Sequence, residues 1–230
     1  MIDVKFPNAC SEFIYVRTYS RWIDDKKRRE TWPETVERYI GFITKYQPDI
    51  PKKTIRKIRK YVLSFEVMPS MRMLWAAGPP AEKDNTCIYN CSFANIDSIE
   101  SFAECLHILM CGTGFGFSVS EKHVNKLPIV PELTTDRLPD YVVPDSKEGW
   151  ADSVKVLMNS LYEGKHIHFD YSELRPEGSR LTTMGGRSSG PAPLIRLHQF
   201  MREVFSKAQG RKLRPIDCHD ICNQIAEIVV

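Results

Sequence analysis

A short strand, a helix and a glycine-rich turn follow one another in the middle of this chain, and their order constrains the fold more than any other feature. The apolar segment Cys87–Phe93 has the length and composition of a buried strand. A helix is expected next over residues 98–110, because apolar side chains recur there at helical spacing. Glycines alternate over residues 112–116, and a second strand begins at residues 116–119. This order joins parallel strands, so we expect a β-α-β unit in an α/β fold.

The composition is that of a globular protein with a sizeable core. The 230 residues are 42% hydrophobic and 27% charged. The net charge of +3 is too small to favour nucleic acid as a partner. No apolar run approaches the ~20 residues of a membrane span, and the first residues lack the apolar stretch of a signal peptide. The expected compartment is therefore the cytoplasm, where the seven cysteines would be free thiols.

A change from helical patterns to strand and loop patterns divides the chain into two expected domains. Residues 1–68 are expected to be a helical N-terminal region, with helices that begin near Arg17, Thr31 and Lys52. Residues 69–230 are expected to hold the α/β part. Its further expected elements are helices over 148–162, 194–207 and 215–230, a strand over 166–170 and a surface excursion over 123–147.

Cys91 is the first candidate for chemistry. Cys87 lies four residues before it, and an even separation on a strand places both side chains on one face. A thiol beside a bound substrate can donate electrons and end in a disulfide, provided that it has a partner thiol. The alternative is that Cys91 is a buried structural cysteine.

Two glycine-rich loops are candidates for ligand binding. The glycines of residues 112–116 would allow the backbone to approach a phosphate or ribose closely, and the alternative is a tight helix-to-strand turn. The loop Gly185–Gly190 combines glycines, an arginine and two serines, which can recognise a base or a phosphate. Its alternative is an ordinary surface loop.

Two further patterns have simpler interpretations. The basic segment Pro51–Lys60 indicates an amphipathic helix with a solvated face, and phosphate contact is the alternative. Cys218 and Cys222 share a helix face and could form half of a metal site. No second cysteine pair at zinc-finger spacing accompanies them, so we expect core packing and no metal.

Taken together, these segments resemble the N-terminal part of a ribonucleotide reductase large chain, and most closely the adenosylcobalamin-dependent (class II) ribonucleoside-triphosphate reductases. Motifs in the family's order extend over roughly residues 15–230. The stretches that carry the resemblance are Arg17–Trp22, Pro69–Gly78, Asn90–Phe93, Gly112–Ser118, Phe169–Pro176, Gly185–Leu194 and Asp217–Val230.

The resemblance implies a fold and a set of site residues. The implied fold is a ten-stranded α/β barrel, of which only the first part would be present. Cys91 would be one member of the cysteine pair that reduces the ribose after a thiyl radical has removed a hydrogen atom. The other implied site residues are Ser70, Asn90 and Gly114 for the substrate, Asp97 and Ser98 for an effector nucleotide, and Gly185, Gly186, Arg187 and Ser188 for the loop that relays effector identity.

The resemblance also implies partners. These are adenosylcobalamin as cofactor, a ribonucleotide substrate, a deoxynucleoside triphosphate effector, a thioredoxin-like reductant and the C-terminal part of the reductase. The radical cysteine and the second reducing cysteine would belong to that C-terminal part, so this oxidoreductase segment is expected to be inactive alone. The alternative function is a nucleotide-binding or assembly module that keeps only the effector site. The long insertion of the monomeric reductases, expected between Cys91 and Gly112, is absent there.

Overall fold

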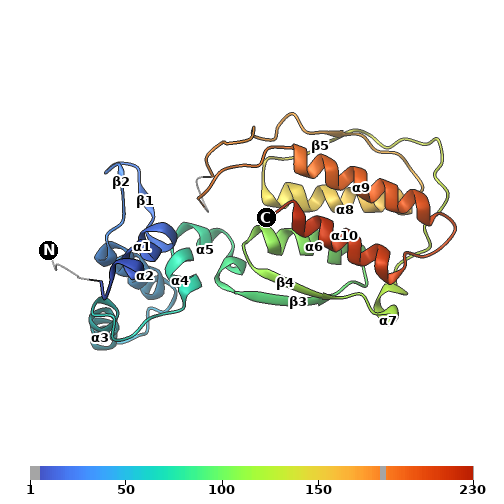
Figure 1. The fold of residues 1–230 in the computed structure, drawn as a ribbon. Helices are drawn as coiled ribbons and strands as arrows, with labels where there is room; N and C mark the ends of the chain where they lie inside the picture. The colour runs from blue at the N-terminus through green and yellow to red at the C-terminus, as the bar shows by residue number, and fades with distance from the viewer. Residues whose placement is uncertain (1–5, 182–184, 230) are drawn as a thin grey trace. The chain divides into compact units, whose positions relative to one another are not determined.

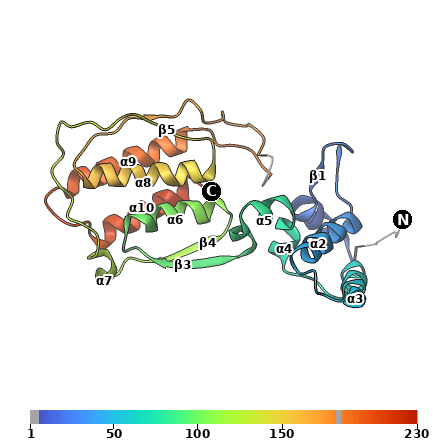
Figure 2. The same ribbon diagram turned by 180° about the vertical axis from the view of Figure 1, so that it is seen from behind.

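The structure, a computed structural model, describes residues 6–181 and 185–229 and forms two compact units, Met1–Tyr89 and Asn90–Val230 (Figures 1 and 2). The boundary between these compact units lies later in the chain than the predicted domain boundary after residue 68. The assignment of residues 1–68 and 69–230 to two domains stays a prediction. Among the described residues, no helix combines the length and the hydropathy that crossing a bilayer requires.

The first unit is mainly helical around a small aromatic core. Its elements are α1 (Ala9–Ile14), the π-helical turn η1 (Tyr15–Tyr19), β1 (Trp22–Ile23), β2 (Arg28–Arg29), α2 (Trp32–Tyr46), α3 (Lys52–Leu63), α4 (Met71–Ala76), α5 (Pro79–Lys83) and the 3-10 turn η2 (Asn85–Ile88). Trp32, Val36 and Ile40 recur at helical spacing on α2 and are buried against Ile55 and Val62 of α3.

Local sequence signals explain where α2 begins, but they do not predict the hairpin that precedes it. The helix predicted to begin near Thr31 is present as α2. Thr31 is its N-cap and forms a capping box with Glu34, while Pro33 occupies the first turn. The prediction that a helix begins at Arg17 is wrong. The chain there leaves η1 and enters the antiparallel hairpin β1–β2, whose turn is closed by Lys27 with a φ of 48°.

A largely buried ion pair holds the hairpin to the helices of this unit. The Arg38 Nε atom lies 2.8 Å from the Glu30 carboxylate, and the side chains are only 14% and 9% exposed. The Arg38 guanidinium also donates to the carbonyl groups of Leu74 and Ala77, next to α4. Glu30 in addition accepts a hydrogen bond from the Thr35 hydroxyl. These charges are therefore paired and hydrogen-bonded, as buried charges must be.

We predict that Glu30→Ala destabilises the chain by about 3–5 kcal/mol, because it leaves the Arg38 charge buried without its carboxylate. Urea unfolding measures the change. The matched control is Lys45→Ala, which breaks the exposed pair with Glu82 and should leave stability nearly unchanged. Equal effects of the two substitutions would contradict the role given to Glu30.

The second unit contains the predicted β-α-β arrangement. Its elements are β3 (Cys91–Asn95), α6 (Ile99–Met110), β4 (Gly114–Ser118), α7 (Glu121–Val124), β5 (Tyr141–Val142), α8 (Lys147–Tyr162), β6 (Phe169–Asp170), α9 (Ala192–Ala208) and α10 (Pro215–Glu227). β3 and β4 pair in parallel, which confirms the prediction from the order of the elements. β5 and β6 form a second short parallel pair.

The helices of this unit form two layers on one side of β3 and β4. α6 and α10 lie next to the strands, and α8 and α9 lie beyond them (Figures 1 and 2). Phe102, Leu106, Leu157 and Met201 are among the fully buried side chains of the shared core. The sheets are small: the described residues form three two-stranded sheets. A mixed α/β fold is thus present.

A buried histidine joins α8 to α9 within this core. The Ser153 hydroxyl donates to the Trp150 carbonyl, so it accepts from His198 Nε2 at 3.0 Å. The Tyr171 hydroxyl then donates to Nδ1 at 2.7 Å. Both ring nitrogens are satisfied by the neutral imidazole. Burial, helped by the Arg202 charge, lowers the pKa of His198 to about 3.

This pKa makes stability depend on pH with a definite sign. Below pH 6.5 the unfolded chain takes up a proton on His198 that the folded chain refuses until about pH 3. We therefore predict that this histidine removes about 1.4 kcal/mol of stability per pH unit as the pH falls through that window. Urea unfolding at pH 7.5 and 5 should show a larger loss for the native chain than for His198→Gln. The same loss in both would refute the assignment.

Candidate functional site

The parallel ladder of β3 and β4 defines the candidate site. Cys91 lies opposite Gly114, and the Gly114 amide donates to the Asn90 carbonyl at 2.9 Å. The Ser92 hydroxyl donates to the Gly114 carbonyl at 3.0 Å. Three of the predicted residues, Asn90, Cys91 and Gly114, are therefore brought together by backbone pairing, which fixes their positions firmly.

The two faces of this small sheet differ. Phe115 and Phe117 are half-buried and pack against the core of the unit. Cys91 and Phe93 are exposed on the alternate positions, opposite Gly114 and Gly116. Side chains of a strand alternate between its faces, so the sulfur projects from the open face. The alternative of a buried structural cysteine is therefore excluded for Cys91.

Gly114 keeps the space next to the sulfur open. A Cβ atom at this position would lie 3.3 Å from the Asn90 carbonyl oxygen and 4.0 Å from Cys91 Sγ. Any side chain would therefore crowd the approach to the thiol. The glycine leaves backbone and sulfur accessible to a ligand that lies flat on the sheet.

Cys87 does not share the face of Cys91. It lies in η2, a 3-10 turn, and is buried, whereas β3 starts only at Cys91. The prediction of one strand over Cys87–Phe93 is wrong for its first half. Asp84 accepts from the Thr86 amide and starts the turn, so local hydrogen bonding overrides the apolar pattern here.

Asp97 and Ser98 lie at the N-terminus of α6. Ser98 is the N-cap and accepts from the Ser101 amide at 3.3 Å. Asp97 forms an ion pair with Lys126 at 2.7 Å, and the hydrogen bond from Lys126 lowers the pKa of Asp97. Sequence patterns gave no reason to single out Lys126. A helix N-terminus with a carboxylate and an ammonium group can bind both sugar hydroxyls and phosphates.

The loop with residues Gly185–Ser188 is a short turn. Residues 182–184, which precede this loop, lie outside the described residues. Gly185 and Gly186 have φ values of 79° and 91°, which glycine adopts readily. Arg187 donates to the Gly178 carbonyl at 2.8 Å, and Ser188 pairs with Ser179. The arginine thus holds the turn together while remaining exposed.

Ser70 belongs to the first unit, where it is the exposed N-cap of α4 and accepts from the Met73 amide at 3.5 Å. A helix of 6 residues has a weak dipole, so the hydroxyl itself is the group available to a ligand.

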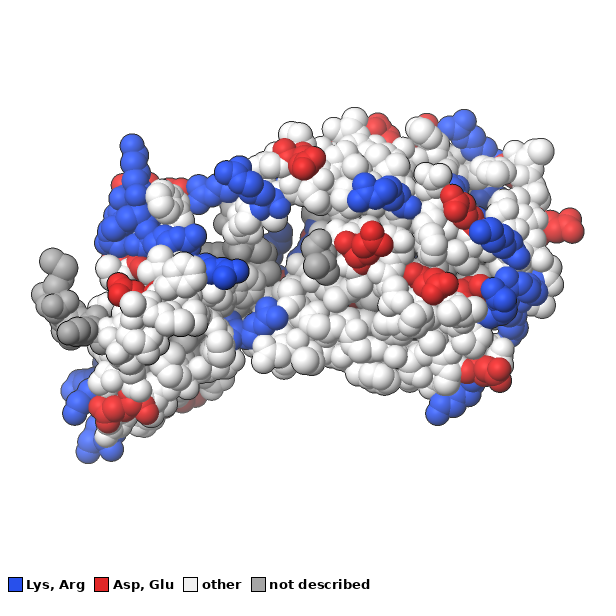
Figure 3. All heavy atoms as spheres, in the orientation of Figure 1, with Lys and Arg blue, Asp and Glu red and all other residues white. Residues whose placement is uncertain are grey.

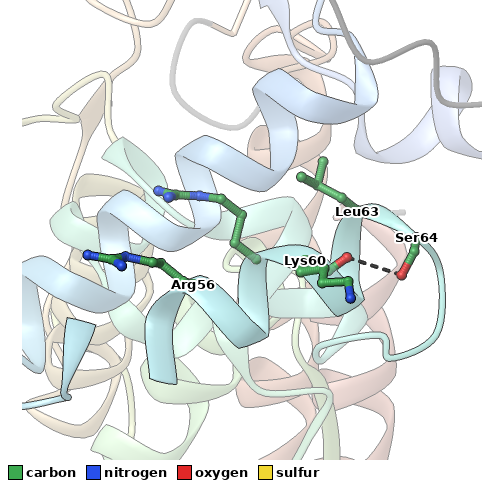
Figure 4. A pocket seen from close by; sticks show the side chains of 5 residues that line it. Arg56, Lys60, Leu63 and Ser64 are labelled. Atoms are coloured by element: carbon green, nitrogen blue, oxygen red, sulfur yellow. Dashed lines mark hydrogen bonds between the residues drawn. The ribbon is translucent and has the colours of Figure 1, made fainter. Parts of the chain in front are cut away.

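The basic helix α3 carries a pocket of its own. The pocket has a volume of about 390 Å³ and is lined by Arg56, Arg59, Lys60, Leu63 and Ser64 (Figure 4). Arg59 is paired with Glu37, and the Ser64 hydroxyl donates to the Lys60 carbonyl. Lys and Arg also gather over the β1–β2 hairpin (Figure 3). None of the predicted site residues lines this pocket, so we do not place the chemistry there.

The metal-ligating side chains of the described residues are considered within each unit. Taken singly, neither unit brings together three metal-ligating side chains among them. Cys218 and Cys222 are buried in the core on α10, where burial raises the pKa of the Cys218 thiol to about 12. The neighbouring His219 is exposed and contacts Asn223 and Asp220.

Two family models match the chain. The model described as "Ribonucleotide reductase alpha domain" matches residues 2–79. The model described as "B12-dependent ribonucleotide reductase, insertion domain" matches residues 119–205. The residues that match the insertion domain follow β4 and include α8 and most of α9, and they do not lie between Cys91 and Gly112, where the sequence showed no insertion.

Known proteins are similar over nearly the whole chain. The adenosylcobalamin-dependent ribonucleoside-triphosphate reductase of Lactobacillus gasseri is 28% identical, over 94% of this chain and 39% of its own length. That of Euglena gracilis is 29% identical, over 97% of this chain and 33% of its own. A crystal structure of a B12-dependent (class II) ribonucleotide reductase superposes with a TM-score of 0.79 at 25% identity, over 95% of this chain and 40% of that one. The chain thus spans about two fifths or less of these relatives.

The exposure of Cys91 leads to a prediction. Cys10 and Cys91 are the exposed cysteines, and the other five are buried. We expect two thiols to react quickly with a maleimide in the native chain and the rest only on unfolding. Gly114→Val should slow the labelling of Cys91, because its side chain would crowd Sγ, and leave Cys10 as the unchanged internal control. Labelling of Cys91 at the rate of the buried thiols would contradict the open site.

Proposed function

The chain belongs to the B12-dependent (class II) ribonucleotide reductases, and on that premise we propose that it forms part of the wall of a ribonucleotide-reducing site, with Cys91 as one half of the reducing dithiol. The observation that carries this proposal is the exposed Cys91 sulfur on the open face of β3–β4, beside Gly114. A reducing thiol must be reachable by both substrate and partner thiol, and this position meets that requirement.

The proposed reaction balances with two thiols. The ribose loses its 2′-hydroxyl group, which leaves as water, and a hydrogen takes its place. The two electrons and two hydrogens come from Cys91 and a second cysteine, whose sulfurs join in a disulfide. A thiyl radical elsewhere in the reductase would start the reaction by removing a hydrogen atom from the ribose. A thioredoxin-like protein would return the disulfide to two thiols.

We propose that the β3–α6–β4 unit is the first part of a ten-stranded α/β barrel. Parallel sheets are usually covered on both faces, whereas the face with Cys91 and Phe93 is open here. A barrel lined by this face would give the thiol a cavity protected from bulk water. Such protection suits radical chemistry, because it prevents side reactions.

The proposed nucleotide contacts are those that the family resemblance implies. Ser70 offers a hydroxyl to the substrate, and Asn90 and Gly114 offer an amide and an accessible backbone. Asp97 and Ser98 would bind a deoxynucleoside triphosphate effector, with Asp97 accepting from the sugar and Lys126 facing its phosphates. The turn formed by Gly185, Gly186, Arg187 and Ser188 would relay effector identity to the substrate base.

The cofactor proposed for the whole reductase is adenosylcobalamin, which would initiate the radical when bound. The residues near Cys91 do not form a site for it. The open face beside the sulfur carries Phe93 and two glycines, and none of these offers a side-chain metal ligand. We therefore assign no residue of this chain to the cofactor. The cytoplasm is the proposed compartment, since the thiols must remain reduced.

Complementation tests this function. We predict that the chain alone makes no deoxynucleotide, and that adding a C-terminal reductase segment with adenosylcobalamin and a dithiol restores turnover. Cys91→Ser should abolish multiple turnovers, whereas Cys10→Ser, which alters the other exposed thiol, should not. Calorimetry should find the same deoxynucleoside triphosphate affinity in native chain and Cys91→Ser, and a weaker one in Asp97→Ala.

Each outcome decides between the functions. Sustained turnover by the Cys91→Ser mixture would refute the reducing role of this thiol. Nucleotide binding without any rescue by the C-terminal segment would instead favour a binding or assembly module that keeps only the effector site.

A further inference from the structure

A second cysteine of this unit makes a contact that the proposed reduction does not use. Cys111 is the C-cap of α6, and Lys147 is the first residue of α8. Lys147 Nζ lies 3.0 Å from Cys111 Sγ. The two residues are thirty-six positions apart in sequence, and the packing of α6 against α8 brings them together.

The contact is largely shielded from water, and a base lies near the thiol. Cys111 is fully buried, and the Lys147 side chain is only 17% exposed. Lys147 stands at the start of α8, a helix of 16 residues, and its Nζ atom donates to the sulfur. A ring nitrogen of His107 lies within 4.8 Å of Cys111 Sγ and can accept the thiol proton.

We propose that Cys111 and Lys147 are a modification site, at which dioxygen joins the sulfur and the nitrogen through one bridging oxygen atom. The thiol and the neutral amine react with one molecule of dioxygen. One S–H bond and one N–H bond break, one S–O bond and one N–O bond form, and the second oxygen atom leaves as water. Sulfur and nitrogen each lose two electrons, and dioxygen gains the four. A separation of 3.0 Å lets one oxygen atom bridge the two with little movement.

The bridge is reversible by a thiol reductant. Two molecules of dithiothreitol supply four electrons and four hydrogens. They return the cysteine thiol and the lysine amine, release the bridging oxygen as water and become two cyclic disulfides. This behaviour separates the bridge from a sulfinic acid, which such reductants do not reverse.

The position of the bridge gives it a consequence for the glycine turn. Gly112, with a φ of 78°, follows Cys111 directly, and β4 begins two residues later at Gly114. A covalent link from Cys111 to α8 would fix the start of this turn. The contact involves only α6 and α8, so the bridge stands or falls independently of the ribonucleotide chemistry.

Peptide mass spectrometry of the full chain tests the proposal. The chain is exposed to air, denatured in the presence of iodoacetamide to block free thiols, and digested with trypsin without reductant. The reference is a sample kept under argon with dithiothreitol. We expect peptide 84–122, which contains Cys111, to be joined to peptide 138–155, uncleaved at Lys147. The joined mass should exceed the sum of the two peptides by one oxygen atom less two hydrogens. Dithiothreitol should reduce the amount of the joined peptides at least tenfold.

Two variants and one control make the result specific. Lys147→Arg and Cys111→Ser should each lack the joined species, while Lys155→Arg, which alters a half-exposed lysine on the same helix, should retain it. Circular dichroism checks that each variant is folded. If Cys111→Ser does not fold, the comparison of the native chain with Lys147→Arg still tests the proposal. Three outcomes would each overturn the proposal. They are oxidation of Cys111 without a link to Lys147, a link that survives in Lys147→Arg, and the absence of any oxygen-dependent change.

Discussion

The parallel pairing of β3 with β4 is the interaction on which the rest of the site depends. It sets the Cys91 sulfur opposite Gly114 through backbone hydrogen bonds, and no side-chain contact is needed to hold that register. The connection through α6 makes the pairing possible, because parallel strands need a crossover of a dozen or more residues. The same helix then provides Ser98 at its start and Cys111 at its end. One β-α-β unit therefore positions the Cys91 thiol, the candidate contacts Gly114, Asp97 and Ser98, and the cysteine of the lysine–cysteine pair.

The region that matches the family's insertion domain is part of the same core as this unit. α8 and α9 bury Leu157 and Met201 against the hydrophobic cluster that also contains Phe102 and Leu106 of α6. Apolar burial of this kind couples the stability of the elements that share it. We therefore expect a change within the insertion to affect the stability of α6, which leads into the glycine turn. The hydrogen bonds of His198 to Ser153 and Tyr171 add directional links between α8, α9 and the segment after β6.

Sequence reasoning succeeded where a pattern depends on local physics. The helix start near Thr31 and the long amphipathic helices follow from start signals and periodicity, and the parallel pairing of β3 and β4 follows from the order of the elements. The structure has all of them. Sequence reasoning failed where tertiary contacts or short turns determine the local backbone structure. The hairpin after η1 depends on Glu30 meeting Arg38, and the 3-10 turn at Cys87 has too few residues for a periodic signal. The positions of Lys126 and Lys147 were not predictable, since nothing local distinguishes one lysine from another. The roles of the nucleotide-contacting residues rest on resemblance and stay predictions.

The open face of the small sheet has a practical consequence for work with this chain. The Phe93 ring lies across Gly116 and is 67% exposed, and within the described residues each strand pairs on one edge alone. Unpaired strand edges next to exposed aromatic rings are templates for intermolecular pairing. We therefore expect concentrated samples to self-associate at this sheet. Dilute conditions would keep the Cys91 sulfur free for chemistry, whereas crowding would cover it with a neighbouring molecule.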